Sequence, residues 1–388
     1  MTKRAMTWLA ASAALASEGA MLKTDFEGGS LPEGWETNDA SVLFRPGEGL
    51  ELAPGAGVAK DGGRPSLRSP PIPIRPFQYA ACDFTVRAEG AFNWTTIFYD
   101  REGNALAADS YDRLEGAAGW RTNRFCIRGH AQAAGFRLAF MPDGGPLVLG
   151  RVAVEETDAA GAAAWADGVA AGFPAVAAPA AGARDDRLPR TMKILREGGR
   201  LRIVMLGDSI CNDTSNSLFE TLLMRRYPKA RIEVVTSVKG ATGCWYYKRR
   251  GQLKSYVFQY EPDLTVIAGI SHHYDAEAIR SVVRQIRKQG GSEVLVVSGA
   301  ISPEAAVFRG FQANPVAPKN AAALAELFPG RLRAMTEDEA VAFLDMRAEW
   351  ERAVPASGRP NAWFQRDAIH GNTAGKQLAG RILARYFD

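Results

Sequence analysis

A serine, and a histidine with an aspartate nearby, are the residues of this sequence whose types and spacing suit nucleophilic catalysis. Ser209 follows Gly207, which ends the apolar run 203–206. Asp367 stands three residues before His370, just ahead of a segment with helical periodicity. An aspartate placed in this way can accept the imidazole Nδ1 proton, which leaves Nε2 free to take a proton from a serine. The two blocks together predict acyl transfer through a serine nucleophile.

The elements around Ser209 predict that it lies where α/β domains bind ligands. Four consecutive apolar residues at 203–206 are typical of a strand that is covered on both faces. Residues 212–217 offer several helix N-caps before the apolar-periodic segment 218–227. Strand, tight turn and helix then place Ser209 at the carboxyl end of a buried strand. A plain turn or cap residue is the alternative for a serine taken alone.

The remainder of the C-terminal half repeats strand and helix patterns. Such repeats predict a parallel sheet with right-handed crossovers, and hence a three-layer α/β/α domain over 187–388. The expected strands are 231–237, 263–268, 294–298 and 341–344, and the expected helices are 187–195, 274–289, 321–328 with Asn320 as a cap, and 374–386.

These blocks resemble the SGNH family, also called GDSL-like hydrolases. Gly207-Asp208-Ser209-Ile210 matches the nucleophile block, 367–370 matches the base block, and the resemblance covers roughly 187–388. It implies that Ser209 is the nucleophile, His370 the base and Asp367 the residue that orients it. It also implies that no metal or organic cofactor is required.

The same resemblance assigns an oxyanion hole. The backbone N–H groups of Ser209 and Gly240 would face the oxyanion, and the third donor is usually the Asn of a Gly-x-Asn-Asp block. Here Ser271 stands at that position, and losing an oxyanion donor typically costs about 10² to 10³ in rate.

Three further residues, Asp208, His272 and Trp245, are expected to bind substrate. For His272 a helix-cap role is the alternative, and adjacent His272 and His273 at a strand end point opposite ways, so they do not form a chelating pair. His272 with Asp275 is a rival base couple, but there the acid follows the histidine, inside the expected helix, where it would cap backbone groups.

The four cysteines fall into two regional pairs, Cys82 with Cys126 and Cys211 with Cys244. In the family's arrangement the loops of Cys211 and Cys244 should be neighbours, so a disulfide is expected there if the protein is exported. Free buried cysteines are the alternative. A Cys82–Cys126 bridge is a weaker form of the same expectation.

Residues 21–156 show short β-rich runs separated by Gly, Pro, Asn and Asp, as in an antiparallel β-sandwich. The region resembles jelly-roll carbohydrate-binding modules. Its aromatic residues could form a sugar-stacking platform, although such side chains are more often core. They are Trp35, Trp94, Tyr99 and Trp120.

Length and composition complete the domain plan. A chain of 388 residues predicts at least two domains, and the Ala/Gly/Pro-rich segment 157–186 is expected to be a linker. Residues 1–20 have the pattern of a signal peptide, which predicts a secreted or periplasmic protein without a membrane span. With 47 basic and 43 acidic residues, the net charge of +4 gives no reason to expect nucleic acid as a partner.

Together these features predict a serine esterase that removes acyl groups, most simply acetyl, from a carbohydrate. Two alternatives stay open at this point. The same triad can pass an acyl group to a sugar hydroxyl as an O-acyltransferase, and Ser271 is compatible with a glycan-binding protein whose SGNH-like domain is catalytically impaired. The oligomeric state is not readable from the sequence.

Overall fold

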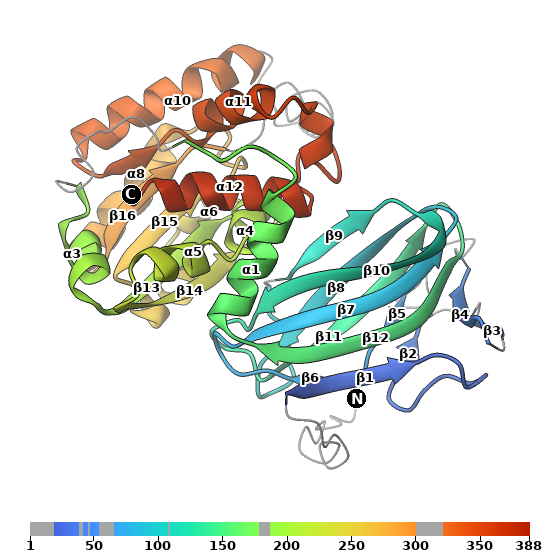
Figure 1. The fold of residues 1–388 in the computed structure, drawn as a ribbon. Helices are drawn as coiled ribbons and strands as arrows, with labels where there is room; N and C mark the ends of the chain where they lie inside the picture. The colour runs from blue at the N-terminus through green and yellow to red at the C-terminus, as the bar shows by residue number, and fades with distance from the viewer. Residues whose placement is uncertain are drawn as a thin grey trace. The chain divides into compact units, whose positions relative to one another are not determined.

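The computed structural model of the chain describes residues 19–38, 42–45, 47–53, 66–107, 109–177, 187–299 and 321–388. It divides into two compact units, Met1–Trp165 and Ala166–Asp388 (Figure 1). The predicted signal peptide lies almost wholly outside the described residues, as does Asn320, the predicted cap.

The first unit contains two antiparallel sheets. One has the order β10-β7-β12-β4-β3 with β1 also paired to β12, and the other has the order β2-β5-β11-β8-β9 with β6 also paired to β11. The strands are β1 Ala20–Asp25, β2 Glu36–Thr37, β3 Val42–Arg45, β4 Gly49–Leu52, β5 Leu67–Arg68, β6 Ile72–Pro73, β7 Tyr79–Ala88, β8 Ala91–Tyr99, β9 Tyr111–Leu114, β10 Ala117–Arg128, β11 Gly135–Asp143 and β12 Leu147–Thr157.

Both sheets contribute side chains to one apolar core. Phe84 of β7 meets Phe140 of β11 at a ring distance of 5.1 Å and Trp94 of β8 at 5.9 Å. Facing sheets that share a core in this way form a sandwich, as the sequence indicated; the jelly-roll topology stays a prediction.

Two of the four aromatic residues considered for a sugar-stacking platform are core residues, which is the interpretation that the sequence favoured. Trp35 and Trp94 are 4% and 2% exposed and belong to the core. Their large apolar rings fill the space between the sheets, so neither can stack on a sugar. Trp120 is 44% exposed, and Tyr99 is partly buried.

The Cys82–Cys126 bridge is also wrong, because the strand register forbids it. Cys82 of β7 stands opposite Phe125 of β10, whereas Cys126 stands opposite Ala81. Successive side chains on a strand point to opposite faces of the sheet, so the two sulfurs lie on opposite faces. Both cysteines are free and buried.

The second unit is built on a five-stranded sheet in which every pairing is parallel. Its order is β14-β13-β15-β16-β17, which puts the strand before Ser209 between two neighbours. All five strands were predicted from the sequence. They are β13 Gly199–Gly207, β14 Ala230–Val238, β15 Leu264–Ala268, β16 Glu293–Val297 and β17 Ala342–Leu344.

Helices contact this sheet in two groups. In one group α12 packs against α4, α5 and α11, and α4 and α5 contact β14. In the second group α8 packs against α6 and α10 and contacts β16, while α10 contacts β17. In Figure 1, α5 and α12 lie in front of the strands. The helices are α3 Pro189–Glu197, α4 Ser209–Ser215, α5 Phe219–Arg226, α6 Cys244–Tyr247, α7 Gln252–Tyr256, α8 Ala276–Gln289, α10 Ala321–Asp338, α11 Met346–Ala356 and α12 Thr373–Arg385, with short 3-10 helices at Phe258–Tyr260 and Asn361–Phe364.

The predicted linker 157–186 was partly wrong, because it contains the helix α1, Ala159–Ala170. Alanine has the highest helix propensity, and the Asp158 carboxylate accepts the N–H of Gly161 at the start of the helix. The helix at 321–328 was also predicted too short: α10 continues past Pro329, where Leu332 and Met335 are buried.

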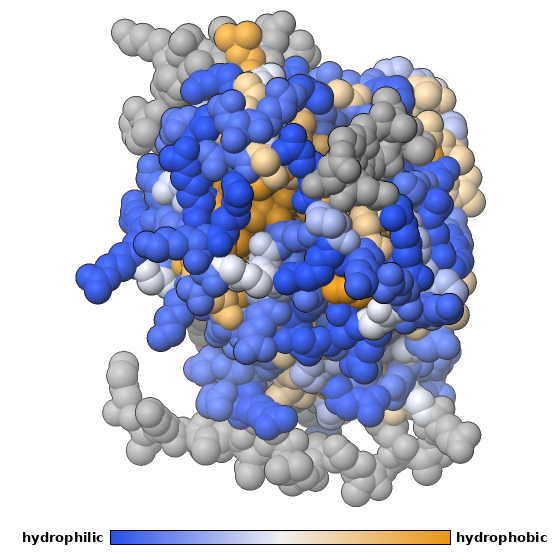
Figure 2. All heavy atoms as spheres, turned by 90° about the vertical axis from the view of Figure 1, so that its left-hand side faces the viewer, coloured by the Kyte–Doolittle hydropathy of each residue, from blue (hydrophilic) through white to orange (hydrophobic). Residues whose placement is uncertain are grey.

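In the described ranges, no helix is long and apolar enough to span a bilayer. The face drawn in Figure 2 is mostly hydrophilic, with a few hydrophobic areas in hollows. Among described residues, large exposed hydrophobic side chains occur at Leu43, Trp120 and Leu327.

Candidate active site

Asp208 fixes the turn that follows β13. The residue is 1% exposed, and its carboxylate accepts backbone N–H groups from two segments of the chain. Its Oδ1 accepts the N–H groups of Ile210 at 2.9 Å and Cys211 at 3.3 Å, and so caps α4. Its Oδ2 accepts those of Ile270 at 2.7 Å and Ser271 at 2.6 Å. Asp208 therefore joins the turn of Ser209 to the loop after β15. The substrate-binding role predicted for it is corrected, because both oxygens are occupied by backbone.

Two glycines permit this close approach of backbones. A side chain on Gly207 would meet the Ala268 carbonyl oxygen at 2.0 Å. Gly269 has φ +115°, and a Cβ there would meet Oδ1 of Asp208 at 2.4 Å. Both positions thus require glycine, one for space and one for space and backbone conformation together.

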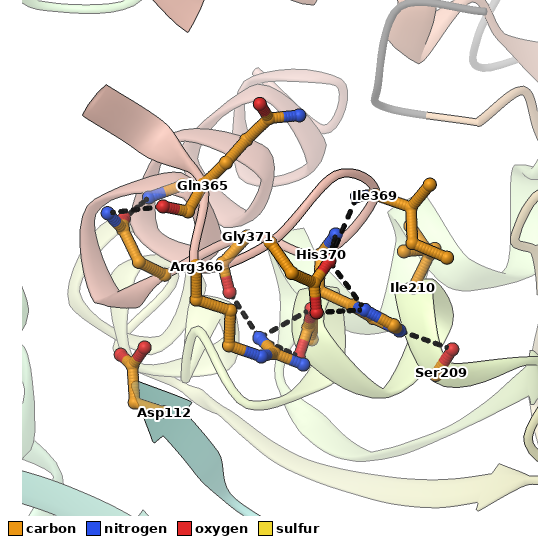
Figure 3. Close-up of polar contacts among 12 residues, drawn as sticks. Asp112, Ser209, Ile210, Gln365, Arg366, Ile369, His370 and Gly371 are labelled. Carbon is orange, nitrogen blue, oxygen red and sulfur yellow. Dashed lines mark hydrogen bonds and ion pairs between the residues drawn. The ribbon is translucent and has the colours of Figure 1, made fainter. Parts of the chain in front are cut away.

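Ser209 is the first residue of α4, and its hydroxyl contacts the imidazole of His370 (Figure 3). His370 Nε2 lies 2.8 Å from Ser209 Oγ. Its Nδ1 lies 2.8 Å and 3.0 Å from the two carboxylate oxygens of Asp367. Since a carboxylate can only accept, Nδ1 carries the proton and Nε2 is the free base nitrogen that faces the hydroxyl. Ser209 and His370 are 161 residues apart in the sequence, and the structure brings them into contact, with Asp367 beside the histidine.

Asp367 is held as a carboxylate. Burial would raise its pKa, but hydrogen bonds from His370 and from the Ile369 N–H outweigh burial and lower the pKa well below its ordinary value of 3.8. The N–H of His370 also donates to Oδ1 at 2.8 Å. The carboxylate therefore orders the short turn as well as the ring.

A buried ion pair that the sequence analysis missed connects the helix of Ser209 to the turn of Asp367 and His370. Asp213, one turn after Ser209 on α4, accepts from Arg366 Nη1 at 2.9 Å and 3.0 Å, and both side chains are 5% exposed. Arg366 also donates to the carbonyl of Gly371 and, through its backbone N–H, to that of His370 at 3.1 Å. In the sequence this ion pair is marked only by the position of its two members, since Arg366 directly precedes Asp367 and Asp213 follows Ser209 by four residues.

The backbone around Ser209 also offers amides for an oxyanion. Within the described parts of the chain, neither the Ser209 N–H nor the Gly240 N–H has a protein acceptor. Gly240 is exposed, and the space where its side chain would project is open. The Ser271 N–H is used by Asp208, which leaves only its hydroxyl as a possible donor.

His272 is corrected from a substrate-binding residue to a structural one. It is 2% exposed, and its Nδ1 accepts the N–H of Cys244 at 3.2 Å. Burial lowers its pKa in spite of the nearby Asp208 charge, so the ring is neutral. Asp275 caps α8 by accepting the Ala278 N–H at 2.9 Å. As expected, it therefore does not orient His272 as a base.

Trp245 lies at the start of α6 and is partly buried. Its Nε1 donates to the Ser271 carbonyl at 2.9 Å, and its ring stacks on His273 at 5.2 Å with an angle of 7° between the planes. Trp245 is therefore attached to the same loop that Asp208 holds.

The predicted Cys211–Cys244 disulfide is wrong, because both residues are free buried thiols. Burial raises the pKa of each thiol well above its ordinary value, which keeps both protonated and unreactive. They pack as small apolar side chains.

No protein-family model and no curated protein matches the chain. Several solved structures do. One is a two-domain esterase, CEX, active on acetylated mannans, with 18% identity over 53% of each chain and a TM-score of 0.40. The present chain thus covers about half the length of that esterase.

Two single esterases match over most of their own length. The acetyl xylan esterase AlAXEase shows 14% identity over 47% of this chain and 98% of its own, with a TM-score of 0.35. A variant of Axe2, an acetyl xylan esterase from Geobacillus stearothermophilus, shows 15% identity over 49% of this chain and 95% of its own, with a TM-score of 0.39.

Proposed function

We propose that the protein is a serine esterase that removes acetyl groups from a carbohydrate. The observation that carries this proposal is the hydrogen-bonded chain from Ser209 Oγ to His370 Nε2 and from His370 Nδ1 to Asp367. A serine activated by a base, with the base held by a third group, is the arrangement that acyl transfer needs.

In the proposed reaction, Ser209 Oγ attacks the acetyl carbonyl carbon while its proton moves to His370 Nε2. The imidazolium then gives this proton to the sugar oxygen as the C–O bond breaks, which leaves an acetyl-serine. Water attacks this ester with His370 again as the base, and acetate leaves as Ser209 recovers its proton. Asp367 stabilises the imidazolium and keeps its orientation throughout.

The backbone N–H groups of Ser209 and Gly240 are the proposed oxyanion donors, with the Ser271 hydroxyl as a third. Donors that are unpaired in the resting site are suited to this role, because they need no rearrangement when the oxyanion forms. The proposal includes a carbohydrate substrate and a glycan-binding first unit, which the two resemblances support. It also includes export of the protein, which the signal-peptide pattern of residues 1–20 supports.

The test is acetate release from p-nitrophenyl acetate and from an O-acetylated oligosaccharide. We expect Ser209→Ala to lower kcat by about 10⁴-fold or more with an unchanged circular dichroism spectrum. Activity retained in a folded Ser209→Ala protein would refute the nucleophile, and transfer of acetyl to a sugar acceptor instead of water would favour the acyltransferase.

A further inference from the structure

The segment that follows β14 has an unusual charge balance. Residues 239–254, named here the basic lip, contain five basic residues and no acidic one, whereas the whole chain is nearly balanced. All five are exposed, and in the described ranges only Lys248 lies within 4.0 Å of a carboxylate, 3.9 Å from Asp275. They are Lys239, Lys248, Arg249, Arg250 and Lys254.

Hydrogen bonds attach the basic lip to the turn that carries Ser209. The N–H of Lys239 donates to the Gly207 carbonyl at 3.0 Å, and the Tyr247 hydroxyl donates to the same carbonyl at 2.6 Å. Trp245 donates to Ser271, which is itself bound to Asp208. The basic lip therefore borders the candidate active site.

The basic lip also carries aromatic rings with cations beside them. The Arg249 guanidinium lies 5.4 Å from the Trp245 ring centroid and 5.6 Å from that of Tyr246. Lys239 Nζ lies 5.9 Å from the Tyr246 ring. His273, which stacks on Trp245, has a left-handed backbone with φ 54°, a conformation that costs energy and is found at binding sites.

The aromatic rings and the cations of the basic lip suit different parts of one ligand. Aromatic faces pack against the apolar faces of sugar rings, and a guanidinium matches the geometry of a carboxylate. A neutral glycan would use the rings but would leave the cations unused. A sugar chain with carboxylate groups would use both.

We propose that the basic lip binds an acidic, carboxylate-bearing polysaccharide, so that the acetyl groups removed at Ser209 are those of a uronic-acid-containing glycan. This proposal rests on the proposed esterase function and specifies its substrate class. Lys239 and Arg249 would contact the carboxylates, and attraction between exposed charges would weaken as salt is added.

The first test compares acetate release from O-acetylated polygalacturonate and from O-acetylated galactomannan of similar length. At about 20 mM NaCl we expect kcat/KM to be about tenfold higher on the acidic polymer, and at about 300 mM the advantage should largely disappear. The double variant Lys239→Gln/Arg249→Gln should lose the advantage at low salt.

The matched control is Lys229→Gln/Lys288→Gln. It removes the same charge from exposed residues next to the amino ends of β14 and β16, at the edge of the sheet opposite Ser209, and should keep the preference. Equal rates on the two polymers in low salt, an advantage that survives in the double variant, or an equal loss in the control would each overturn the proposal.

A second measurement separates polysaccharide binding by the basic lip from ester hydrolysis at Ser209. The Ser209→Ala protein should be retarded in gels containing polygalacturonate and much less in gels containing galactomannan. Equal retardation by both would overturn the basic-lip proposal alone, whereas absence of any acetate release by the wild type, with retardation intact, would overturn the esterase alone.

Discussion

Replacing Arg366 with Met should test whether the buried ion pair positions the catalytic residues. The substitution keeps an aliphatic chain of similar length but removes every hydrogen bond to Asp213 and Gly371. Asp213 then remains buried without its main cation, and loss of one partner of a buried pair typically costs about 3–5 kcal/mol of unfolding free energy. Burial already raises the pKa of Asp213, against the opposing effect of Arg366, which agrees with a carboxylate that depends on its partner.

The effect on activity follows from where Arg366 is attached. Its side chain binds the helix of Ser209 through Asp213 and the turn of His370 through the Gly371 carbonyl, whereas its backbone bond to the His370 carbonyl persists in the variant. Without it, the 2.8 Å contact between Ser209 and His370 loses a constraint on each side. A misplacement of roughly 1 Å costs about 10² in rate, so kcat on p-nitrophenyl acetate should fall about 10²-fold with little change in KM.

Stability and positioning are separated by the double variant Asp213→Leu/Arg366→Met. Replacing both charges by apolar groups is often neutral for stability, so urea unfolding should return to near the wild-type value while kcat stays low. Arg225→Met, which breaks an exposed pair with Asp167, is the matched control and should cost less than about 1 kcal/mol. If the double variant recovers kcat along with stability, the pair supports the fold but does not position the base.

Three further predictions concern the histidines, Asp367 and the cysteines. His370→Ala should lower kcat by about 10⁴-fold, whereas His272→Ala should act mainly on stability, by about 1–3 kcal/mol, because the buried N–H of Cys244 loses its acceptor; the reverse pattern in kinetics and urea unfolding would exchange their roles. The lowered pKa of Asp367 means that its carboxylate stabilises the fold above pH 3.8 and that this stabilisation is lost as the pH falls below 3.8. The free energy of unfolding should therefore fall more steeply with acid in the wild type than in Asp367→Asn. Equal acid-unfolding curves would contradict this. The four thiols should resist a thiol reagent in the native protein and all react in denaturant without reductant; fewer than four would indicate a disulfide.

Local patterns predicted the strands and the Asp367–His370 couple because each depends on residues close in sequence, whereas the pairing of His370 with Ser209, 161 positions away, was expected from the family resemblance. The apolar run 203–206 defines β13 by itself, and Asp367 reaches His370 within one turn. The Asp213–Arg366 pair joins residues 153 positions apart, and nothing local marks it. The Cys82–Cys126 pairing failed for a similar reason, since whether two side chains on neighbouring strands share a face depends on the register of the strands.

The loop after β15 shows what holds the backbone at Ser271, the position at which the SGNH proteins that the sequence resembles usually have asparagine. Its backbone is held from both sides, with the N–H of Ser271 on Asp208 and its carbonyl on Trp245. Gly243 packs against the same stretch so closely that a Cβ there would meet the Ser271 carbonyl oxygen at 2.3 Å. The conformation of the loop thus depends on backbone contacts and not on the side chain at 271. That side chain can change without moving the Ser209 turn, because Asp208 binds the amide of residue 271, which every residue except proline provides.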